Sequence, residues 1–237
     1  MISIKLVNTM GYAVCQSNVY SSKESFLPIS YTFSGGNIYG LISDFGRGSW
    51  ALATCLGGKG EWIEGDVLLN NTKIIGQELL QLSCFVGEKI LCDTRSDNSC
   101  LSAKMCIDRA LKISGLNYTT LEIKNLFSLS DERFERDMNC VGKEIWRIST
   151  AIGFALNKEI FCYPWLNTHD VVECIDESMI CILKRFHKIV IIPLCRAALN
   201  TSIKKSFDNI INFHDYQQSC FQIHPEERKR LSKIKGW

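Results

Sequence analysis

A glycine-rich segment at residues 43–51 has the composition of a turn that binds a phosphate group. Gly46 and Gly48 stand between an apolar run at residues 37–42 and an apolar segment typical of a helix. At a junction of strand, turn and helix, backbone N–H groups and the helix dipole point at one place and favour an anion. An ordinary tight turn accounts for the same spacing, so the segment by itself leaves both interpretations open.

The segment departs from a working phosphate loop at the positions that contact nucleotide and metal. The working pattern is G-x-x-x-x-G-K-[ST], in which the lysine reaches the phosphates and the hydroxyl binds Mg²⁺. Here Ser43 stands at the first glycine and Ser49 at the lysine. Trp50 and Ala51, an indole and a methyl group, occupy the hydroxyl positions. The candidate phosphate-contacting residues are therefore Ser43, Gly46, Arg47, Gly48, Ser49, Trp50 and Ala51.

Other side chains that could do chemistry have simpler explanations. His169 and Asp170 could form an acid–base pair, but Asp170 is better explained as the cap of a helix that starts near residue 171. Trp50, Trp146 and Trp165 could stack on an adenine ring, although aromatic side chains more often fill a core or an interface.

The twelve cysteines do not have the spacing of a zinc site. They include no C-x-x-C pair, and only four histidines accompany them, whereas structural zinc needs clustered ligands. Several of them lie in apolar runs, as Cys162, Cys181 and Cys195 do. We therefore expect small buried side chains in a reducing compartment and no metal site.

Length and composition exclude several classes of protein. The 237 residues suffice for one large domain, and a hydrophobic fraction of 46% excludes disorder. A net charge of +2 gives no basic footprint for nucleic acid. The longest apolar run, Ile189–Cys195, is far shorter than the roughly 20 residues of a membrane span, and we see no signal peptide. We predict one domain over residues 1–237.

Alternating strand and helix patterns predict an α/β fold. Strands are expected at 37–42, 66–69, 159–163 and 188–192, and helices at 48–56, 102–113, 144–156, 171–186 and 225–235. Strands followed by helices imply a mostly parallel sheet with helices on its faces. In the helix at 144–156, the small residues Ala151, Gly153 and Ala155 should allow close packing on that sheet.

Five segments between roughly residues 30 and 200 resemble, in their order and spacing, the motifs of the nucleotide-binding subunit of an ABC transporter. The chain is similar to a degenerate member of that family. Residues 33–51 resemble the phosphate-loop strand and turn, and 56–58 with 65–69 the segment after it. The signature motif L-S-G-G-Q/E corresponds to Val141, Gly142, Lys143 and Glu144. Residues 155–166 resemble the approach to the Walker B strand, with Pro164 and Trp165 at its acidic positions, and 188–195 the strand before the switch histidine.

The resemblance implies a P-loop NTPase-like (ABC ATPase) core with a small antiparallel β part and a helical subdomain inserted at about residues 87–137. It implies ATP as the ligand, a membrane-spanning permease as partner, and another ABC ATPase subunit in a homo- or heterodimer. The groove of the helical subdomain would receive a short helix of the membrane partner. The chain would then lie at the cytoplasmic face of the cell membrane, with no nucleic acid bound.

The replaced residues predict weak or absent ATP hydrolysis. Phosphoryl transfer needs charge stabilisation and a placed water molecule, and Ser49, Trp50, Pro164 and Trp165 supply neither cation, metal ligand nor carboxylate. No switch histidine follows Cys195. One lost electrostatic contact costs about 3 kcal/mol, roughly a hundredfold in rate. We expect no catalytic residue and no Mg²⁺ at this site; the residues do not decide whether ATP binds.

Two further functions stay open. The chain could be a soluble regulatory or scaffold protein that keeps the fold and acts without a transporter. It could also be an enzyme with replaced chemistry at Ser49 or a cysteine, but the motif holds no histidine to activate a nucleophile. Within a transporter, Gly142 and Lys143 could still assist the nucleotide of an active partner subunit.

Overall fold

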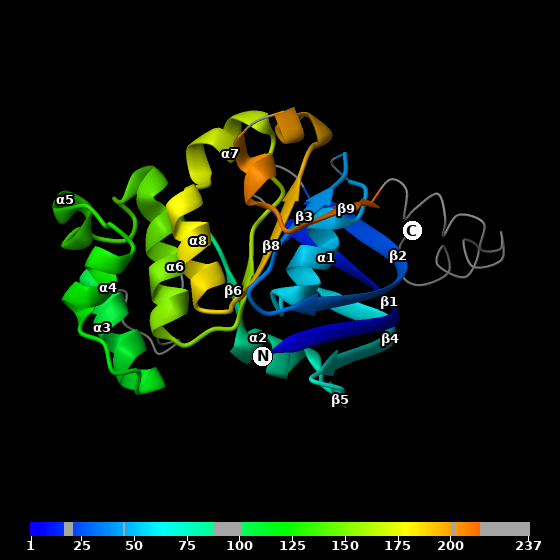
Figure 1. Ribbon diagram of the computed structural model, residues 1–237, viewed down its shortest axis with the longest axis horizontal. Coiled ribbons are helices and arrows are strands. Elements are labelled where there is room, and N and C mark those ends of the chain that lie inside the picture. Colours follow the sequence, from blue (N-terminus) through cyan, green and yellow to red (C-terminus); the bar gives the residue numbers. More distant parts are fainter. Residues whose placement is uncertain (17–20, 45, 88–100, 201, 214–237) are drawn as a thin grey trace.

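The computed structural model describes residues 1–16, 21–44, 46–87, 101–200 and 202–213, and two sheets enclose one helix (Figure 1). The strands are β1 (Ser3–Gln16), β2 (Ser21–Ser34), β3 (Ile38–Ile42), β4 (Glu61–Leu69), β5 (Thr72–Lys73), β6 (Ser83–Phe85), β7 (Ile160–Cys162), β8 (Ile189–Leu194) and β9 (Asn209–Asn212). The α-helices are α1 (Ser49–Leu56), α2 (Gly76–Leu82), α3 (Ala103–Ser114), α4 (Thr120–Leu126), α5 (Asp131–Phe134), α6 (Ile145–Ala155), α7 (Thr168–Cys174) and α8 (Glu177–Arg185). Short 3-10 helices are η1 (Gly142–Glu144), η2 (Arg196–Asn200) and η3 (Ser202–Ser206).

The central sheet is parallel, with the strand order β6-β7-β8-β3-β9. Its inner strands are buried on both faces, as continuous apolar runs require. Along β8, Ile189 and Ile191 pack on the side of α1, whereas Val190 and Ile192 pack on the opposite side. The predicted α/β architecture is confirmed, and the carboxyl ends of these strands meet at one edge.

The second sheet is antiparallel, with the order β2-β1-β4-β5. Strands β1 and β2 pair from Ser3 opposite Ser34 to Gln16 opposite Ser21. The sequence reasoning did not predict these two long strands, and it placed the start of β4 five residues too late. Helix α1 lies between the two sheets, and seven of its eight residues are buried.

The opposite face of the parallel sheet is covered by α6 and α8, with α3, α4 and α5 stacked outside α6 (Figure 1). A Cβ atom on Gly153 of α6 would lie 2.5 Å from Sγ of Cys84 on β6, so the expected close packing of this helix is confirmed. Helix α3 also has its expected ends, because Ser102 caps it by accepting a bond from the Met105 N–H and Gly115 ends it with a φ of 68°.

One predicted helix, at residues 171–186, is two helices. The chain is extended at Ile175 and Asp176, and the Asp176 carboxylate caps α8 by accepting a bond from the Ser178 N–H at 2.8 Å. The apolar periodicity continues across this break, which hides it. Asn167 caps α7, so the assignment of that role to Asp170 is wrong. The predicted helix at 225–235, and residues 88–100 of the predicted subdomain, lie outside the described residues.

The described cysteines are divided between core and surface. Burial is as expected for Cys55, Cys84, Cys106 and Cys162, whereas Cys195 is half-buried and Cys140 and Cys181 are exposed. Cys181 lies on the outer face of α8, so the apolar run around it was misleading. Within the described ranges, no helix has the length and apolar character needed to span a bilayer.

Candidate phosphate-binding site

The glycine turn links the carboxyl end of β3 to the amino end of α1. Gly46 has a φ of 78° and Gly48 a φ of 99°, in the left-handed region that favours glycine. The Ser43 N–H donates to the Leu194 carbonyl at 3.1 Å, which ties the start of the turn to β8. The turn therefore leaves several backbone N–H groups at the amino end of α1 for an outside partner.

That partner is the carboxylate of Glu24 on β2. Its Oε1 accepts from the N–H groups of Gly48 at 2.7 Å, Trp50 at 3.1 Å and Ala51 at 3.4 Å, and its Oε2 accepts from Gly46 at 3.0 Å. As a residue, Glu24 is only 5% exposed. An internal carboxylate thus holds the four donors that the sequence assigned to a phosphate; the cradle is here defined as the backbone N–H groups of Gly46, Gly48, Trp50 and Ala51.

Two opposing effects act on Glu24. Burial raises the pKa of this carboxyl group, and the four backbone donors partly offset that rise, leaving the pKa above its ordinary value of 4.5. Both oxygens accept from N–H groups, an arrangement that suits the ionised form. The site consequently carries a negative group where a phosphate site requires positive potential.

Strand β2 lies directly against the turn. A Cβ atom added to Gly48 would lie 2.9 Å from Cβ of Phe26 and 3.0 Å from the carbonyl oxygen of Ser25. Glu24 and Phe26 alternate with the exposed or half-buried Lys23 and Ser25, so both face inward. That alternation, with an acidic residue at an inward position, is the signal that could have identified Glu24 from the sequence.

Two of the sequence-predicted segments meet beside the cradle. Ser49, at the position of the missing lysine, is fully buried, and its hydroxyl is in hydrogen-bonding contact with that of Ser43. Trp165, at an acidic Walker B position, donates its indole N–H to the Ser43 carbonyl at 3.3 Å. The structure therefore brings the turn and the end of β7 together, and Pro164 precedes this indole.

These residues do not fit a Mg²⁺ ion. Magnesium takes oxygen ligands in an octahedral arrangement, commonly with one or two carboxylates. Beside the turn stand the indole of Trp165 and the buried, mutually bonded hydroxyls of Ser43 and Ser49. The carboxylate of Glu24 is already bound by backbone N–H groups. No metal-dependent step can be derived from this set.

The remaining residues of the turn, and Trp146 on α6, pack in the core or lie on the surface. The side chain of Trp50 packs against the core between the sheets, and Ala51 is fully buried. Arg47 is exposed, and its N–H donates to the Asp44 carbonyl at 3.2 Å. Trp146 stacks on Tyr163, with ring centroids 6.3 Å apart and an angle of 8° between the rings.

The signature-like segment lies at the start of α6. Val141 is buried, Gly142 has a φ of 59°, and Lys143 is exposed. The Glu144 carboxylate accepts from the N–H and the hydroxyl of Ser130, each at 2.7 Å. This glutamate therefore anchors the segment to the amino end of α5.

His169 and Asp170 stand on the surface of α7. The distance between Nδ1 of His169 and Oδ1 of Asp170 is 4.0 Å, and their side chains are 74% and 40% exposed. Such exposure provides none of the burial that tunes an acid–base pair for catalysis.

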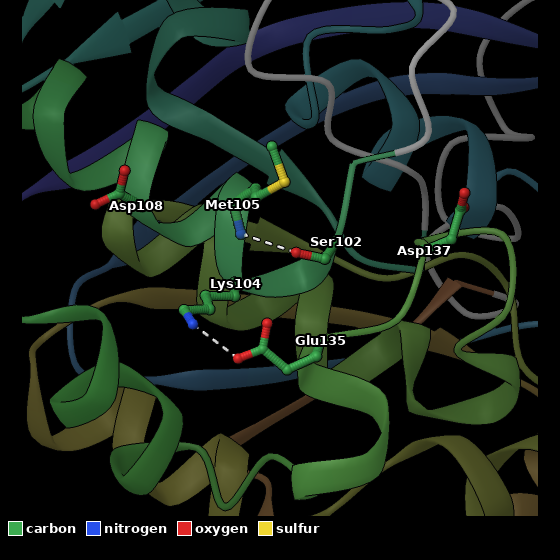
Figure 2. A pocket seen from close by; sticks show the side chains of 6 residues that line it. All are labelled: Ser102, Lys104, Met105, Asp108, Glu135 and Asp137. Atoms are coloured by element: carbon green, nitrogen blue, oxygen red, sulfur yellow. Dashed lines mark hydrogen bonds and ion pairs between the residues drawn. The ribbon is translucent and has the colours of Figure 1, made fainter.

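Several hollows open on the part of the molecule that the structure describes, and two of them lie at segments that the sequence singled out. One of about 190 Å³, lined by Ile42, Ser43, Asp44, Arg196 and Asn212, lies at the carboxyl edge of the parallel sheet. Another, of about 420 Å³, lies beside α3 and is lined by Ser102, Lys104, Met105, Asp108, Glu135 and Asp137 (Figure 2). In this second hollow, Nζ of Lys104 pairs with Oε1 of Glu135 at 2.8 Å.

Comparisons with known proteins identify the fold. No family model matches the chain. It is 26% identical over 175 residues to the methionine import ATP-binding protein MetN of Clostridioides difficile (strain 630), covering 68% of this chain and 49% of that protein. The chain thus spans about half the length of this curated relative.

Solved structures agree with that match. A putative ABC transporter ATP-binding protein from Pyrococcus furiosus superimposes with a TM-score of 0.60 at 18% identity, covering 90% of this chain and 98% of that one. MJ0796, a bacterial ABC transporter cassette whose structure is dimeric, gives a TM-score of 0.58 at 15% identity, covering 89% and 94%. The expected ABC ATPase fold and the resemblance to an ABC ATP-binding subunit are confirmed.

Proposed function

We propose that this chain, which has the fold of an ABC ATPase cassette, is a subunit of a membrane transporter that itself hydrolyses ATP weakly or not at all. It would lie at the cytoplasmic face of the membrane, bound to a membrane-spanning permease and to a second ABC ATPase subunit. The match to an import ATP-binding protein and the likeness to a dimeric cassette support these partners.

The state of the glycine turn carries the catalytic part of the proposal. The turn keeps the backbone that would bind a phosphate, but Ser49 offers no cation and Trp165 no carboxylate. The four donors of the cradle are directed at Glu24. Because electrostatic stabilisation supplies most of the rate in phosphoryl transfer, turnover at this loop should be at background.

The hollow of Figure 2 is our proposed contact for the permease. It places Met105, 47% exposed, beside the Lys104–Glu135 pair and the carboxylates of Asp108 and Asp137. A short cytosolic helix with an apolar side chain flanked by basic ones would complement this lining.

The decisive experiment isolates the tagged chain from detergent-solubilised membranes of its own host. We expect a multi-span membrane protein and an intact ABC ATPase subunit to co-purify. Met105→Glu should reduce this recovery, whereas Ile113→Glu, at a 63% exposed position on the same helix, should not. Repeated recovery without a membrane protein would contradict the proposal and favour a regulatory or scaffold protein.

Steady-state ATP hydrolysis by the purified chain tests the catalytic part. We expect a rate equal to that of a mock preparation. If a rate remains, Gly46→Asp shows whether it arises at this loop, because the added carboxylate would repel a phosphate there. The variant should fold, since no atom of the described residues lies within 4 Å of a Cβ at Gly46 and aspartate tolerates a left-handed backbone. Brisk turnover that Gly46→Asp abolishes would overturn the proposed inactivity.

A further inference from the structure

The carboxylate of Glu24 has the position and the bonds of a bound anion. It lies at the amino end of α1, where the helix dipole and the N–H groups that have no acceptor within the helix favour negative charge. Its two oxygens together accept from four backbone donors. Because each of these donors already has an acceptor, an incoming phosphate would have to displace the carboxylate to bind.

Displacement of Glu24 is opposed by its strand. Glu24 pairs with Ala13 within the long β1–β2 ladder, and the next residues of β2 touch the turn at Gly48. An anion can therefore reach the cradle only if the side chain turns out or β2 separates from the turn. If the side chain turns out while β2 stays in place, a carboxylate remains near the phosphate, and Ser49 provides no positive charge to compensate for it. If β2 separates, the contacts of Ser25 and Phe26 with the turn are lost as well.

We propose that Glu24 is a built-in ligand of the glycine turn, which takes the place of a phosphoryl group and excludes polyphosphate ligands from it. This inference deepens the proposed function, on which it rests, by naming what closes the site. It predicts that removing the carboxylate opens an anion-binding site. A purely structural role of Glu24 as a distant helix cap predicts lost stability without any such gain.

The test is a titration with inorganic tripolyphosphate, followed through the amide NMR resonances of Gly46 and Gly48. Wild type, Glu24→Ala and Glu24→Gln are compared with Glu61→Ala, which removes an exposed carboxylate from β4. If the carboxylate leaves the cradle open less than about a tenth of the time, the wild-type Kd exceeds that of an open cradle at least about tenfold. We expect Glu24→Ala to bind at least about tenfold more tightly than wild type, and Glu61→Ala to equal wild type.

A second variant and an independent readout keep the inference falsifiable. Glu24→Gln retains the length of the side chain and one acceptor but loses the charge, so it should bind more tightly than wild type even if Glu24→Ala does not fold. A Kd for the foldable variants within about twofold of wild type would overturn the inference. Tight binding by a Glu24 variant without a permease at purification would sustain the inference and contradict the proposed function. If the wild-type chain binds tripolyphosphate tightly at Gly46 and Gly48 and still recovers its permease, the inference about Glu24 would be contradicted and the proposed function sustained.

Discussion

Replacing Glu24 by alanine should destabilise the folded chain by about 2–4 kcal/mol, and the contacts of the carboxylate set this figure. Of its four donors, the N–H groups of Gly48 and Ala51 belong to buried residues, while Gly46 is exposed and Trp50 half-buried. A buried donor without an acceptor costs about 1–3 kcal/mol. The short Gly48 bond accounts for most of the loss, and the longer Ala51 bond for less. The N–H groups of Gly46 and Trp50 contribute little, because they can donate to water instead.

Urea denaturation at neutral pH measures this loss. Glu24→Gln keeps an acceptor for the donors on Oε1 but turns an amide N–H₂ toward another N–H, so we expect a smaller loss of about 1–2 kcal/mol. Glu61→Ala, which removes an exposed carboxylate that accepts from the Tyr12 hydroxyl, should stay within about 1 kcal/mol of wild type. A Glu24→Ala variant equally close to wild type would refute the reasoning, because the carboxylate would then not bind the cradle in solution.

Three further predictions concern the same region and the thiols. Burial raises the pKa of Glu24 above 4.5, so the unfolding free energy of wild type relative to Glu24→Gln should be highest below that value and fall as the pH rises through the raised pKa; urea titrations showing a rise would contradict this. Gly48→Ala should lower the unfolding free energy by about 2–4 kcal/mol, because its Cβ would contact Phe26 and its φ is 99°. Gly46→Ala, whose Cβ would meet no atom of the described residues within 4 Å, should lower it by about 1–2 kcal/mol. Equal losses of stability in thermal melts would argue against close packing of β2 on the turn. A thiol reagent should modify the exposed Cys140 and Cys181 before the buried Cys84, because burial raises the pKa of Cys84 to about 12. Equally fast labelling of Cys84, followed by mass spectrometry, would count against its burial.

Local patterns in the sequence predicted the parallel core because its strands and helices have strong signals of their own. The buried runs at β3 and β8 and the capped ends of α3 are readable within a few residues. The paired strands β1 and β2 lack a buried apolar run of this kind, and the register shifts between Leu6 and Gly11 interrupt the regular alternation of inward and outward residues along their ladder. The break between α7 and α8 is hidden because the apolar period of both helices stays in phase.

The sequence predicted the glycine turn of the candidate site, but it did not predict which group accepts from the N–H groups of that turn. The glycines at 46 and 48 mark the turn directly, because the left-handed backbone favours them. Its acceptor, Glu24, is 22 residues from Gly46 along the chain and reaches it through the pairing of β2 with β1. Alternation along β2 marks Glu24 as an inward-facing acid, but its contact with the turn follows from the three-dimensional arrangement of the second sheet.

A crystal structure of the wild-type chain grown with excess ATP and Mg²⁺ tests the central claim most directly. The account predicts that the Glu24 carboxylate still accepts from the N–H groups of Gly46 and Gly48, with no triphosphate on the turn. A triphosphate bound to those N–H groups, with the Glu24 side chain turned away, would contradict it.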